Sequence, residues 1–439
     1  MLYISTSGKD KTDLRGAVKC CYAPDGGIYL PERLPVIPRA YFNNIAEMSL
    51  TEIAYVVANM LLGDEIDAGT IKSVVDRAFD FDIPLRQLPS GVHVLELFNG
   101  PTHAFKDISA RFMSALLQTH ARISGVHPVV LTATTGNTGE AIADAFAGIE
   151  GVDTVVLYPQ GAMSRSELSR FAAMGAGVHV VEVAGTIDQC KTMVRQVVTE
   201  HNATGKIRLL TANTHNVVRL LPQIVYFFHA CARLAAAGHR PDGFSVAIPC
   251  GNLSNLTSAV MARRMGLPMG RIVAGCSANN GFARVLDGTL APGDVSHISA
   301  RTLARAMDSG YPTNLPRLLA LYKGDLQAMR RDISAASVSD EQIRDTIRHA
   351  DMAESYLLDP HTAVAYAALR SIPDSGTHEV VLATAHPAKS AATVSQILGR
   401  EIEPLPMPAC CNGAHAPRTA KTAPTAAALN RYIQTHIKP

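Results

Sequence analysis

The first part of the chain carries apolar residues at helical spacing. In SLTEIAYVVANMLL (49–62), apolar side chains return every three or four positions, and a second run of this kind follows Asp67. Each run ends near a glycine or before the Ile-Pro pair at 83–84. The pattern predicts a small helical N-terminal subdomain, which we place at residues 1–84.

From about residue 91 the pattern changes to short, uniformly apolar runs that alternate with longer amphipathic segments. The apolar runs are VVLTA (129–133), TVVLY (154–158), VHVVEV (178–183), SVAIP (245–249), RIVAG (271–275) and EVVLAT (379–384). Strands that are apolar on both faces and alternate with helices predict parallel sheets covered on both sides. Such sheets bind ligands at the carboxyl ends of their strands, where a loop enters a helix.

These elements suggest a domain plan. We expect residues 85–400 to form the main α/β region, with a smaller domain at about 105–220 inserted in a larger one. Residues 401–439 are rich in Pro, Ala and Thr and then read AAALNRYIQTHI, which predicts a linker followed by a helix. The expected architecture is therefore α/β, with two doubly wound parallel-sheet domains and the N-terminal subdomain.

Composition narrows the class of protein. A chain of 439 residues with 47% hydrophobic and 18% charged residues is a globular protein with ample core. Its formal net charge of +2 gives no electrostatic footprint for nucleic acid or an acidic membrane. The chain lacks a signal-peptide pattern and an uncharged apolar run long enough to cross a bilayer. With no Cys-x-x-Cys or H-E-x-x-H spacing, we expect a cytoplasmic protein with reduced thiols and no metal site.

One lysine lies in unusual surroundings. The stretch LELFNGPTHAFKDISARFM (95–113) places Lys106 among apolar and small residues, after a Gly-Pro corner and before Asp107. A partly buried amine loses its proton readily and can form a Schiff base with a carbonyl. An ordinary lysine at the start of a helix fits the same residues, so this stretch alone leaves both interpretations open.

Two loops follow strands and open helices. Thr134–Gly139 follows the first apolar run, and Gly251–Asn255 follows SVAIP. Backbone N–H groups at a helix N-terminus attract anions through the helix dipole and their own donors. A tight turn with an Asn or Thr cap explains the first loop equally well.

Two further segments have polar residues at the start of a helix or the end of a strand. LDPHTAV (358–364) has a proline at a helix start, and TAHPAK (384–389) ends a strand. The hydroxyl of Thr384 could form a hydrogen bond with a ring nitrogen of a ligand. For His361 and His386 we favour capping or satisfied core polarity over direct catalysis.

In this order, five segments resemble the threonine synthase family. They are LELFNGPTHAFKD, LTATTGNTGEA, IPCGNLSN, LDPHTAVAY and LATAHPAK. The resemblance begins at YISTSG near the N-terminus and extends to about residue 400. It implies a fold-type-II enzyme, similar to the tryptophan synthase β subunit, that depends on pyridoxal 5′-phosphate. Its reaction would convert O-phospho-L-homoserine and water into L-threonine and phosphate.

The resemblance also implies roles for individual residues. Lys106 would hold the cofactor as a Schiff base and later serve as acid and base. The cofactor would be bound further by Asn137, Gly251, Asn252, Leu253, Ser254, Asn255 and Thr384. Asn137 would lie near its 3′ oxygen and Thr384 near its pyridine nitrogen. The substrate side would be formed by Thr134, Thr135, Thr138, Asn213, Arg219 and Arg165.

The largest departure from the family follows TVVLY. The family typically continues G-K-[VI]-S-x-x-Q-x-K-Q, with its lysine and glutamine near the substrate phosphate. Here GAMSRSELSR (161–170) has Ala162 in place of the lysine, and Glu167 brings a like charge toward the phosphate. Arg165 or Arg170 could replace the lost cation. In the cofactor loop, Ser254 replaces the usual glycine and would be strained if its backbone needs a positive φ.

These departures keep two alternatives open beside threonine synthesis. One is a diverged pyridoxal phosphate-dependent β/γ-lyase or phospho-lyase that acts on another amino acid or a phosphorylated amine. The other is a regulatory protein that binds pyridoxal phosphate with little turnover. The expected partner is a small phosphorylated amino acid, without nucleic acid or membrane, and we expect a monomer or a homodimer.

Overall fold

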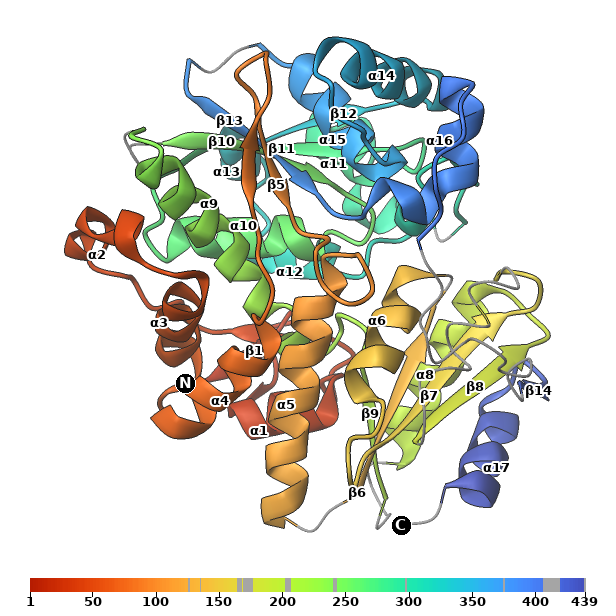
Figure 1. Cartoon of the computed structure of the whole chain (residues 1–439). Helices are drawn as coiled ribbons and strands as arrows, with labels where there is room; N and C mark the ends of the chain where they lie inside the picture. The colour runs from red at the N-terminus through yellow and green to blue at the C-terminus, as the bar shows by residue number, and fades with distance from the viewer. Residues whose placement is uncertain are drawn as a thin grey trace.

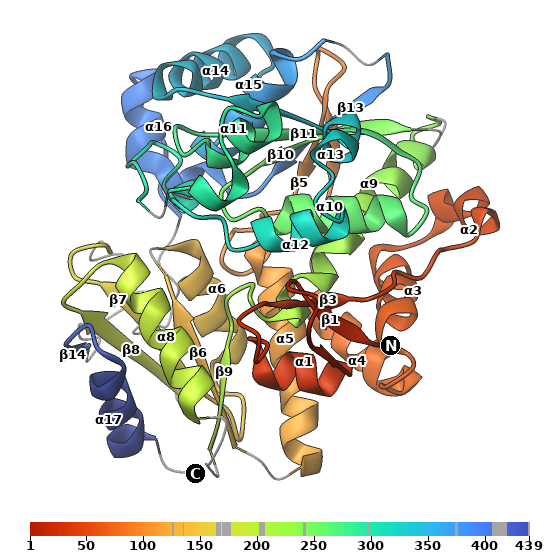
Figure 2. The ribbon, with the colours of Figure 1, turned by 180° about the vertical axis from the view of Figure 1, so that it is seen from behind.

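A computed structural model gives the arrangement of most of the chain. It describes residues 1–124, 127–134, 136–163, 168, 177–201, 207–239, 243–296, 298–373, 376–405 and 419–437. Figure 1 shows a larger sheet domain above a smaller one, with the N-terminal segment beside both. The view from behind shows that helix α1 lies beside strand β9, so the N-terminal segment contacts the small domain (Figure 2).

The N-terminal subdomain combines helices with a small antiparallel sheet. Its helices are α1 (Leu14–Cys20), α2 (Arg39–Asn43), η1 (Ile45–Glu47), α3 (Leu50–Leu62) and α4 (Ala68–Ala78). Helix α3 begins at a capping box formed by Ser49 and Glu52, and the Asp67 carboxylate caps α4. The sheet has the order β2-β1-β3, with β1 (Tyr3–Ser5), β2 (Lys11–Thr12) and β3 (Tyr29–Pro31). Strands of two or three residues are too short to show a period, so the pattern indicated only the helices.

The large domain contains a six-stranded sheet of order β12-β11-β10-β13-β5-β4. Its strands are β4 (Leu85–Gln87), β5 (His93–Glu96), β10 (Phe244–Pro249), β11 (Met269–Cys276), β12 (Ile333–Ser337) and β13 (His378–Ala383). All neighbours are parallel except β4, which runs antiparallel to β5. Uniformly apolar strands therefore form the predicted parallel sheet.

Helices cover both faces of this sheet. They are η3 (Leu221–Ile224), α9 (Val225–Ala236), α10 (Ser254–Arg264), α11 (Gly281–Asp287), η4 (Pro292–Asp294), η5 (Arg305–Met307), α12 (Leu315–Leu321), α13 (Leu326–Asp332), α14 (Asp340–Ala353), α15 (Pro360–Arg370), η6 (Pro387–Ser390) and α16 (Ala391–Leu398). On β10, Val246 and Ile248 pack into the core that contains α9 and α10, whereas Ala247 packs into the core with α14 and α15. Both faces are buried, as the apolar runs predicted.

The small domain contains a five-stranded parallel sheet of order β14-β8-β7-β6-β9. Its strands are β6 (His127–Ala133), β7 (Asp153–Pro159), β8 (Val178–Val183), β9 (Ile207–Thr211) and β14 (Ala420–Thr422). The helices around it are α5 (Lys106–Ser124), α6 (Asn137–Phe146), α8 (Ile187–His201) and α17 (Ala426–His436). The segment of the tail expected to be a linker thus contributes an edge strand, β14, which pairs with β8, and α17 packs on α8.

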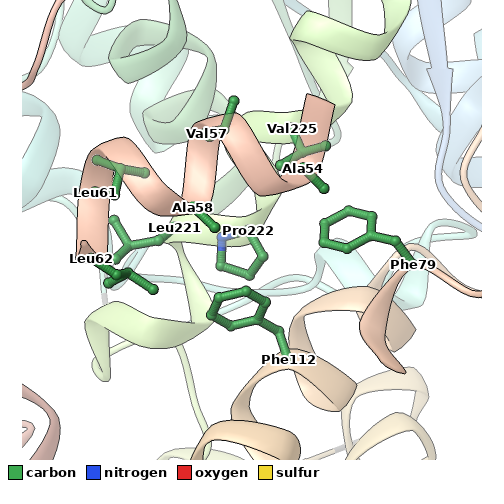
Figure 3. Close-up of a pocket in the computed structure, with 10 residues that line it drawn as sticks. All are labelled: Ala54, Val57, Ala58, Leu61, Leu62, Phe79, Phe112, Leu221, Pro222 and Val225. Atoms are coloured by element: carbon green, nitrogen blue, oxygen red, sulfur yellow. The ribbon is translucent and has the colours of Figure 1, made fainter. Parts of the chain in front are cut away.

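Two apolar features belong to the core. The run Val217–Ala236 is long and apolar enough to cross a membrane by length and composition, but 94% of its apolar stretch is buried inside the protein. A cavity of about 10 Å³, room for roughly one water, lies where α3, η3 and α5 meet (Figure 3). Its ten lining side chains are all apolar, so it is a small packing gap without groups that recognise a ligand.

Candidate active site

The strand order of the large sheet reverses between β10 and β13. From β10 the chain continues to β11 and β12 on one side, and it returns as β13 on the other side, next to β5. In open α/β sheets, ligands bind at the carboxyl ends of the strands at such a reversal. The predicted segments after β10 and β13 therefore lie together, and the segment after β5 joins them.

The turn that leads into α5 is fixed on two sides. The backbone N–H of His386, beyond β13, donates to the carbonyl oxygen of His103 at 3.0 Å. The hydroxyl of Tyr226, on α9, donates to the carbonyl oxygen of Phe105 at 2.7 Å. Lys106 follows as the first residue of α5. Its backbone position is thus set by the large domain, although its helix packs in the small one.

The side chain of Asp107 also stabilises the turn that leads into α5. Its carboxylate accepts the backbone N–H of Thr102 at 2.9 Å and the hydroxyl of the same residue. A Cβ atom on Gly100 would lie 2.6 Å from Asp107 Oδ2, so only glycine fits there. Burial raises the pKa of Asp107 to about 6. This acid is therefore a structural cap beside the lysine.

The amine of Lys106 lies in a setting that disfavours its charge. The side chain is partly buried, and its Nζ atom lies 5.7 Å from the centre of the Phe105 ring. Burial, followed by the nearby cations Arg219 and Lys389, lowers the pKa of this amine to about 8. Within the part of the chain that the structure describes, the amine makes no hydrogen bond. It is therefore free to react with a carbonyl close to neutral pH.

Arg219, at the end of η2 (Val217–Arg219), is a buried cation with donor atoms that lack partners among the described residues. The residue is 2% exposed, and its Nε and Nη1 atoms have no partner among the described residues. Burial lowers the pKa of its guanidinium to about 10. A buried charge is costly unless an opposite charge or acceptor joins it. The free donors near Lys106 therefore indicate a place for an anion.

The loop after β10 is held by its own side chains. Asn252 donates through Nδ2 to the hydroxyl of Thr214 at 2.9 Å, and its Oδ1 accepts the backbone N–H of Thr313 at 2.6 Å. At Gly251, a Cβ atom would lie 2.6 Å from the Cα atom of Met307. Glycine is required there because two backbones approach closely. The amide of Asn252 is thus occupied in bracing the loop.

The end of this loop differs from expectation in one respect. Ser254 is the first residue of α10 and lacks a positive φ, so the strain considered for it is absent. The left-handed conformation falls one residue earlier, at Leu253, with a φ of 59°. Asn255 is 4% exposed, and neither Nδ2 nor Oδ1 of its amide has a partner among the described residues. A buried amide without partners indicates a bound group at this helix N-terminus.

The loop after β6 contains bracing residues beside the start of α6. The hydroxyl of Thr134 accepts the N–H groups of Gly136 at 3.1 Å and Gly139 at 2.9 Å. The amide of Asn213 accepts the N–H of Ala133 and donates to its carbonyl oxygen, both at 3.1 Å. The side chains of Thr134 and Asn213 were expected to contact substrate. In the structure, the same side-chain groups form hydrogen bonds within the protein and so shape this loop.

Of the other residues that were expected near the cofactor and the substrate at this loop, some are described by the structure and some are not. Asn137 and Thr138 are partly buried at the first two positions of α6. Thr135, Arg165 and Glu167 lie outside the described residues. Ala162, the position that lacks the family's lysine, is described, and its N–H donates to the carbonyl oxygen of Pro159 at 3.0 Å.

The two histidines act as caps. His361 accepts the backbone N–H of Ala306 through Nε2 at 3.1 Å, and its Nδ1 contacts the Asp359 carboxylate. His386 accepts the N–H of Ala388 through Nδ1 at 3.2 Å. Both interactions agree with the structural role that we favoured. Within the described ranges, no group of three or more His, Cys, Asp or Glu residues is arranged to hold a metal ion.

Sequence patterns missed a buried arginine behind the site. Arg317, on α12, donates to the carbonyl oxygens of Tyr29 at 2.8 Å and His215 at 2.7 Å, and to the side chain of Asn314 at 2.7 Å. It joins the N-terminal sheet to the loop after β9 and to the segment that holds Asn252. In a sequence, an arginine within a helical pattern is normally interpreted as a surface residue. The role of Arg317 in joining these segments is apparent only from its burial in the structure.

These groups suit pyridoxal phosphate. Lys106 offers an amine of lowered pKa for its aldehyde, and the N-terminus of α10 with the unpaired Asn255 amide offers donors for its phosphate. Thr384, buried after β13, can face its ring, and no described side chain makes a hydrogen bond with its hydroxyl. The fold and site thus define a pyridoxal phosphate-dependent enzyme, and the family described as "Pyridoxal-phosphate dependent enzyme" matches residues 82–384.

Further comparisons specify the family. The families described as "Threonine synthase N terminus" and "Threonine synthase, C-terminal" match residues 2–79 and 362–433. Threonine synthase of Serratia marcescens is 35% identical over 408 residues, covering 92% of each chain. That of Escherichia coli (strain K12) is 34% identical over 404 residues, with the same shares covered. The chain belongs to the threonine synthase family.

Solved structures agree with this assignment over the whole chain. A crystal structure of threonine synthase from Escherichia coli has a TM-score of 0.89 and 31% identity, covering 99% of this chain and 100% of the other. A structure of pyridoxal phosphate-bound threonine synthase from Brucella melitensis has a TM-score of 0.89 and 27% identity, and each chain is covered completely. The predicted family, fold-type-II architecture and cofactor are confirmed.

Proposed function

We propose that this enzyme converts O-phospho-L-homoserine and water into L-threonine and phosphate. The observation that carries the proposal is the amine of Lys106, with a pKa of about 8, near the buried Arg219, whose Nε and Nη1 atoms have no partner among the described residues. An amine that reacts with a carbonyl near a site for an anion suits an amino acid that carries phosphate. The threonine synthase relatives support this choice of substrate.

Pyridoxal phosphate, when bound, supplies an electron sink for the carbons next to the substrate's amino group. The chain's own task is to position the substrate and to move protons. We assign proton transfer to Nζ of Lys106, which takes a proton from the α-carbon and returns protons later in the reaction. Phosphate leaves the γ-carbon, and water adds at the β-carbon. A pKa of about 8 allows one amine to take and give a proton near neutral pH.

The cofactor would be held from three directions. We assign its phosphate to the N-terminus of α10 and the loop Gly251–Asn255, where the buried amide of Asn255 has no partner among the residues that the structure describes. Thr384, at the end of β13, would face the pyridine nitrogen. Asn137, at the start of α6, would lie near the 3′ oxygen. In this assignment the side chain of Asn252 stabilises the loop and does not contact the cofactor, because its amide is already hydrogen-bonded to Thr214 and Thr313.

The substrate would be bound by cations and by a helix N-terminus. We assign Arg219 to one of its anionic groups, and Thr138, at the start of α6, to its carboxylate. Thr135, which lies outside the described residues, keeps the same assignment. Arg165 stays our candidate for the substrate phosphate, since Ala162 lacks the family's cation. Thr134 and Asn213 would act indirectly, by shaping the loop that presents these groups.

A substrate panel with product identification tests the proposal. The purified enzyme with pyridoxal phosphate is incubated with O-phospho-L-homoserine, L-serine, L-threonine and a phosphorylated amine in separate reactions. We expect equal amounts of phosphate and threonine from the first compound alone. Turnover confined to another compound would favour a diverged lyase, and cofactor binding without any turnover would favour the regulatory alternative.

We further propose that the enzyme works in the cytoplasm as a monomer or a homodimer. The described cysteines Cys20, Cys21, Cys190, Cys231, Cys250 and Cys276 are all free, which suits a reducing compartment. The mass of 46.8 kDa makes the two states easy to separate by gel filtration with light scattering. A larger assembly at working concentration would contradict this part of the proposal.

A further inference from the structure

A single lysine side chain links the two sheet domains next to the candidate active site. Lys389 lies on η6, shortly after β13 of the large domain. Its Nζ atom donates to Glu140 Oε2 at 2.6 Å and to the carbonyl oxygen of Thr102 at 2.6 Å. The side chains of the pair are only 9% and 10% exposed. Solvent therefore screens the attraction between these two charges only weakly, and both side chains are held in a defined position.

The two partners of Lys389 belong to the two halves of the site. Glu140 lies in the first turn of α6, three residues after Asn137. Thr102 lies in the turn before Lys106, and it is bonded in turn to the carboxylate of Asp107. A continuous chain of hydrogen bonds thus runs from the helix assigned to the substrate to the start of the helix that carries the cofactor lysine.

We propose that Lys389 and Glu140 are a positioning pair that fixes the N-terminus of α6 against the turn that presents Lys106. The inference rests on the proposed function, because that function assigns the α6 N-terminus to substrate and Lys106 to the cofactor. Neither residue of the pair needs to touch the reacting atoms. The pair acts by setting the separation of two groups that must contact one substrate.

Other charges around the pair agree with this role. Burial raises the pKa of Asp144, one turn further along α6; Arg111 on α5 opposes this rise, and Glu140 adds to it. At Lys106, burial lowers the pKa of the amine and the Lys389 cation adds to that effect. At Asp107, burial raises the pKa of the carboxyl and Lys389 partly opposes the rise. A carboxylate in the first turn of α6 is also favoured by the helix dipole. The pair is therefore electrostatically connected to both helices that it joins.

The first experiment is a double-mutant cycle on the full-length enzyme with pyridoxal phosphate. Lys389→Met keeps the aliphatic length and removes the cation, and Glu140→Gln keeps the shape and removes the anion. We expect Lys389→Met to lower kcat/KM for O-phospho-L-homoserine by roughly 10- to 100-fold, since a small misplacement of reacting groups costs that much. The double variant should be no worse than this single one, because the two residues act as a unit.

A matched control separates positioning from the general loss of an ion pair. Lys72 and Asp76 form a pair at the same distance of 2.6 Å, but with exposures of 67% and 48% on the N-terminal helix α4. Lys72→Met should leave kcat/KM unchanged. Equal effects of Lys72→Met and Lys389→Met, or strictly additive effects of the two substitutions in the cycle, would overturn the proposal. Should Lys389→Met fail to fold, Glu140→Gln with its smaller change decides the matter by its own loss of kcat/KM.

The second readout needs no substrate. In the enzyme with bound cofactor, the pH midpoint of the visible absorbance reports the proton on the Lys106 nitrogen. Removing the Lys389 cation should move that midpoint upward, and removing the Glu140 anion should move it downward. A purely structural role predicts no shift or shifts of one sign, and either result would contradict the inference. An inactive wild-type enzyme would refute the proposed function alone, because the absorbance midpoints would still test the pair.

Discussion

The backbone N–H of Phe105 donates a hydrogen bond of 3.0 Å to the carbonyl oxygen of Thr384. The residue before Lys106, the proposed cofactor lysine, is therefore bonded to the residue that follows β13, next to the reversal of the sheet. Residues Ala104 and Ala385 form an antiparallel bridge at the same place. The two segments are separated by most of the chain, yet the lysine is oriented by the strand end that also carries a candidate cofactor ligand.

Lys106→Ala should abolish covalent attachment of pyridoxal phosphate. The amine is the group assigned to the cofactor aldehyde, and alanine offers no nucleophile. Borohydride reduction followed by peptide mass spectrometry should place the cofactor on Lys106 in the wild-type enzyme and on no peptide of the variant. A variant that still carries covalent cofactor would refute the assignment. Turnover should fall by at least about 10³-fold, since the proton carrier is lost as well.

The pH dependence of cofactor uptake follows from the lowered pKa of Lys106. Only the neutral amine attacks an aldehyde, and its fraction rises about tenfold per pH unit below the pKa and then levels off. With a pKa of about 8, the uptake rate of cofactor-free enzyme should rise between pH 6 and 8 and change little above pH 8.5. Stopped-flow absorbance measures this rate. A rate that continues to climb toward pH 10 would show an ordinary lysine.

Gly251→Ala should weaken cofactor binding. The new Cβ atom would lie 2.6 Å from the Cα atom of Met307, so one of two backbone segments must move. Overpacking of this kind costs about 1–3 kcal/mol, which corresponds to a rise of roughly 5- to 150-fold in the Kd for pyridoxal phosphate. Gly293→Ala is the matched control, because its Cβ would meet nothing within 4 Å. Unchanged affinity in Gly251→Ala would contradict the assignment of this loop.

Arg219→Met should impair substrate use while the cofactor still binds. Loss of a buried cation that pairs with a substrate anion costs about 2 kcal/mol or more, so kcat/KM should fall roughly 30-fold or further. Arg219→Lys keeps the charge but lacks the planar fork, and its loss should be intermediate. Steady-state kinetics and cofactor content measure the two effects separately. If Arg219→Met lost cofactor but kept its KM for O-phospho-L-homoserine, the assignment to substrate would be wrong.

The sequence predicted those features that depend on local pattern. Runs such as SVAIP and EVVLAT are apolar throughout, and both became buried parallel strands. Loops rich in Gly, Asn and Thr lie at strand ends because backbone turns need those residue types. The family motifs then led to the proposal that Lys106 binds the cofactor, and its apolar neighbours in the sequence agreed with a lysine of lowered pKa.

Other features depend on contacts between distant residues, which no local pattern records. Strand β14 has three residues and no buried position, so it exists only because β8 offers an open edge. The amides of Asn252 and Asn213 were assigned to ligands from their motifs, whereas the structure bonds them to Thr214 and Ala133. The residue with a positive φ is Leu253 and not Ser254, because α10 begins at Ser254 and the left-handed turn lies one residue before the helix.

The central claim is that the enzyme releases phosphate from the γ-carbon of O-phospho-L-homoserine and adds water at the β-carbon. The most direct test runs the reaction in water enriched in ¹⁸O and analyses both products by mass spectrometry. Our account predicts threonine and phosphate in equal amounts, with the label in the threonine hydroxyl and none in the phosphate. Labelled phosphate with homoserine, or phosphate released without threonine, would contradict it.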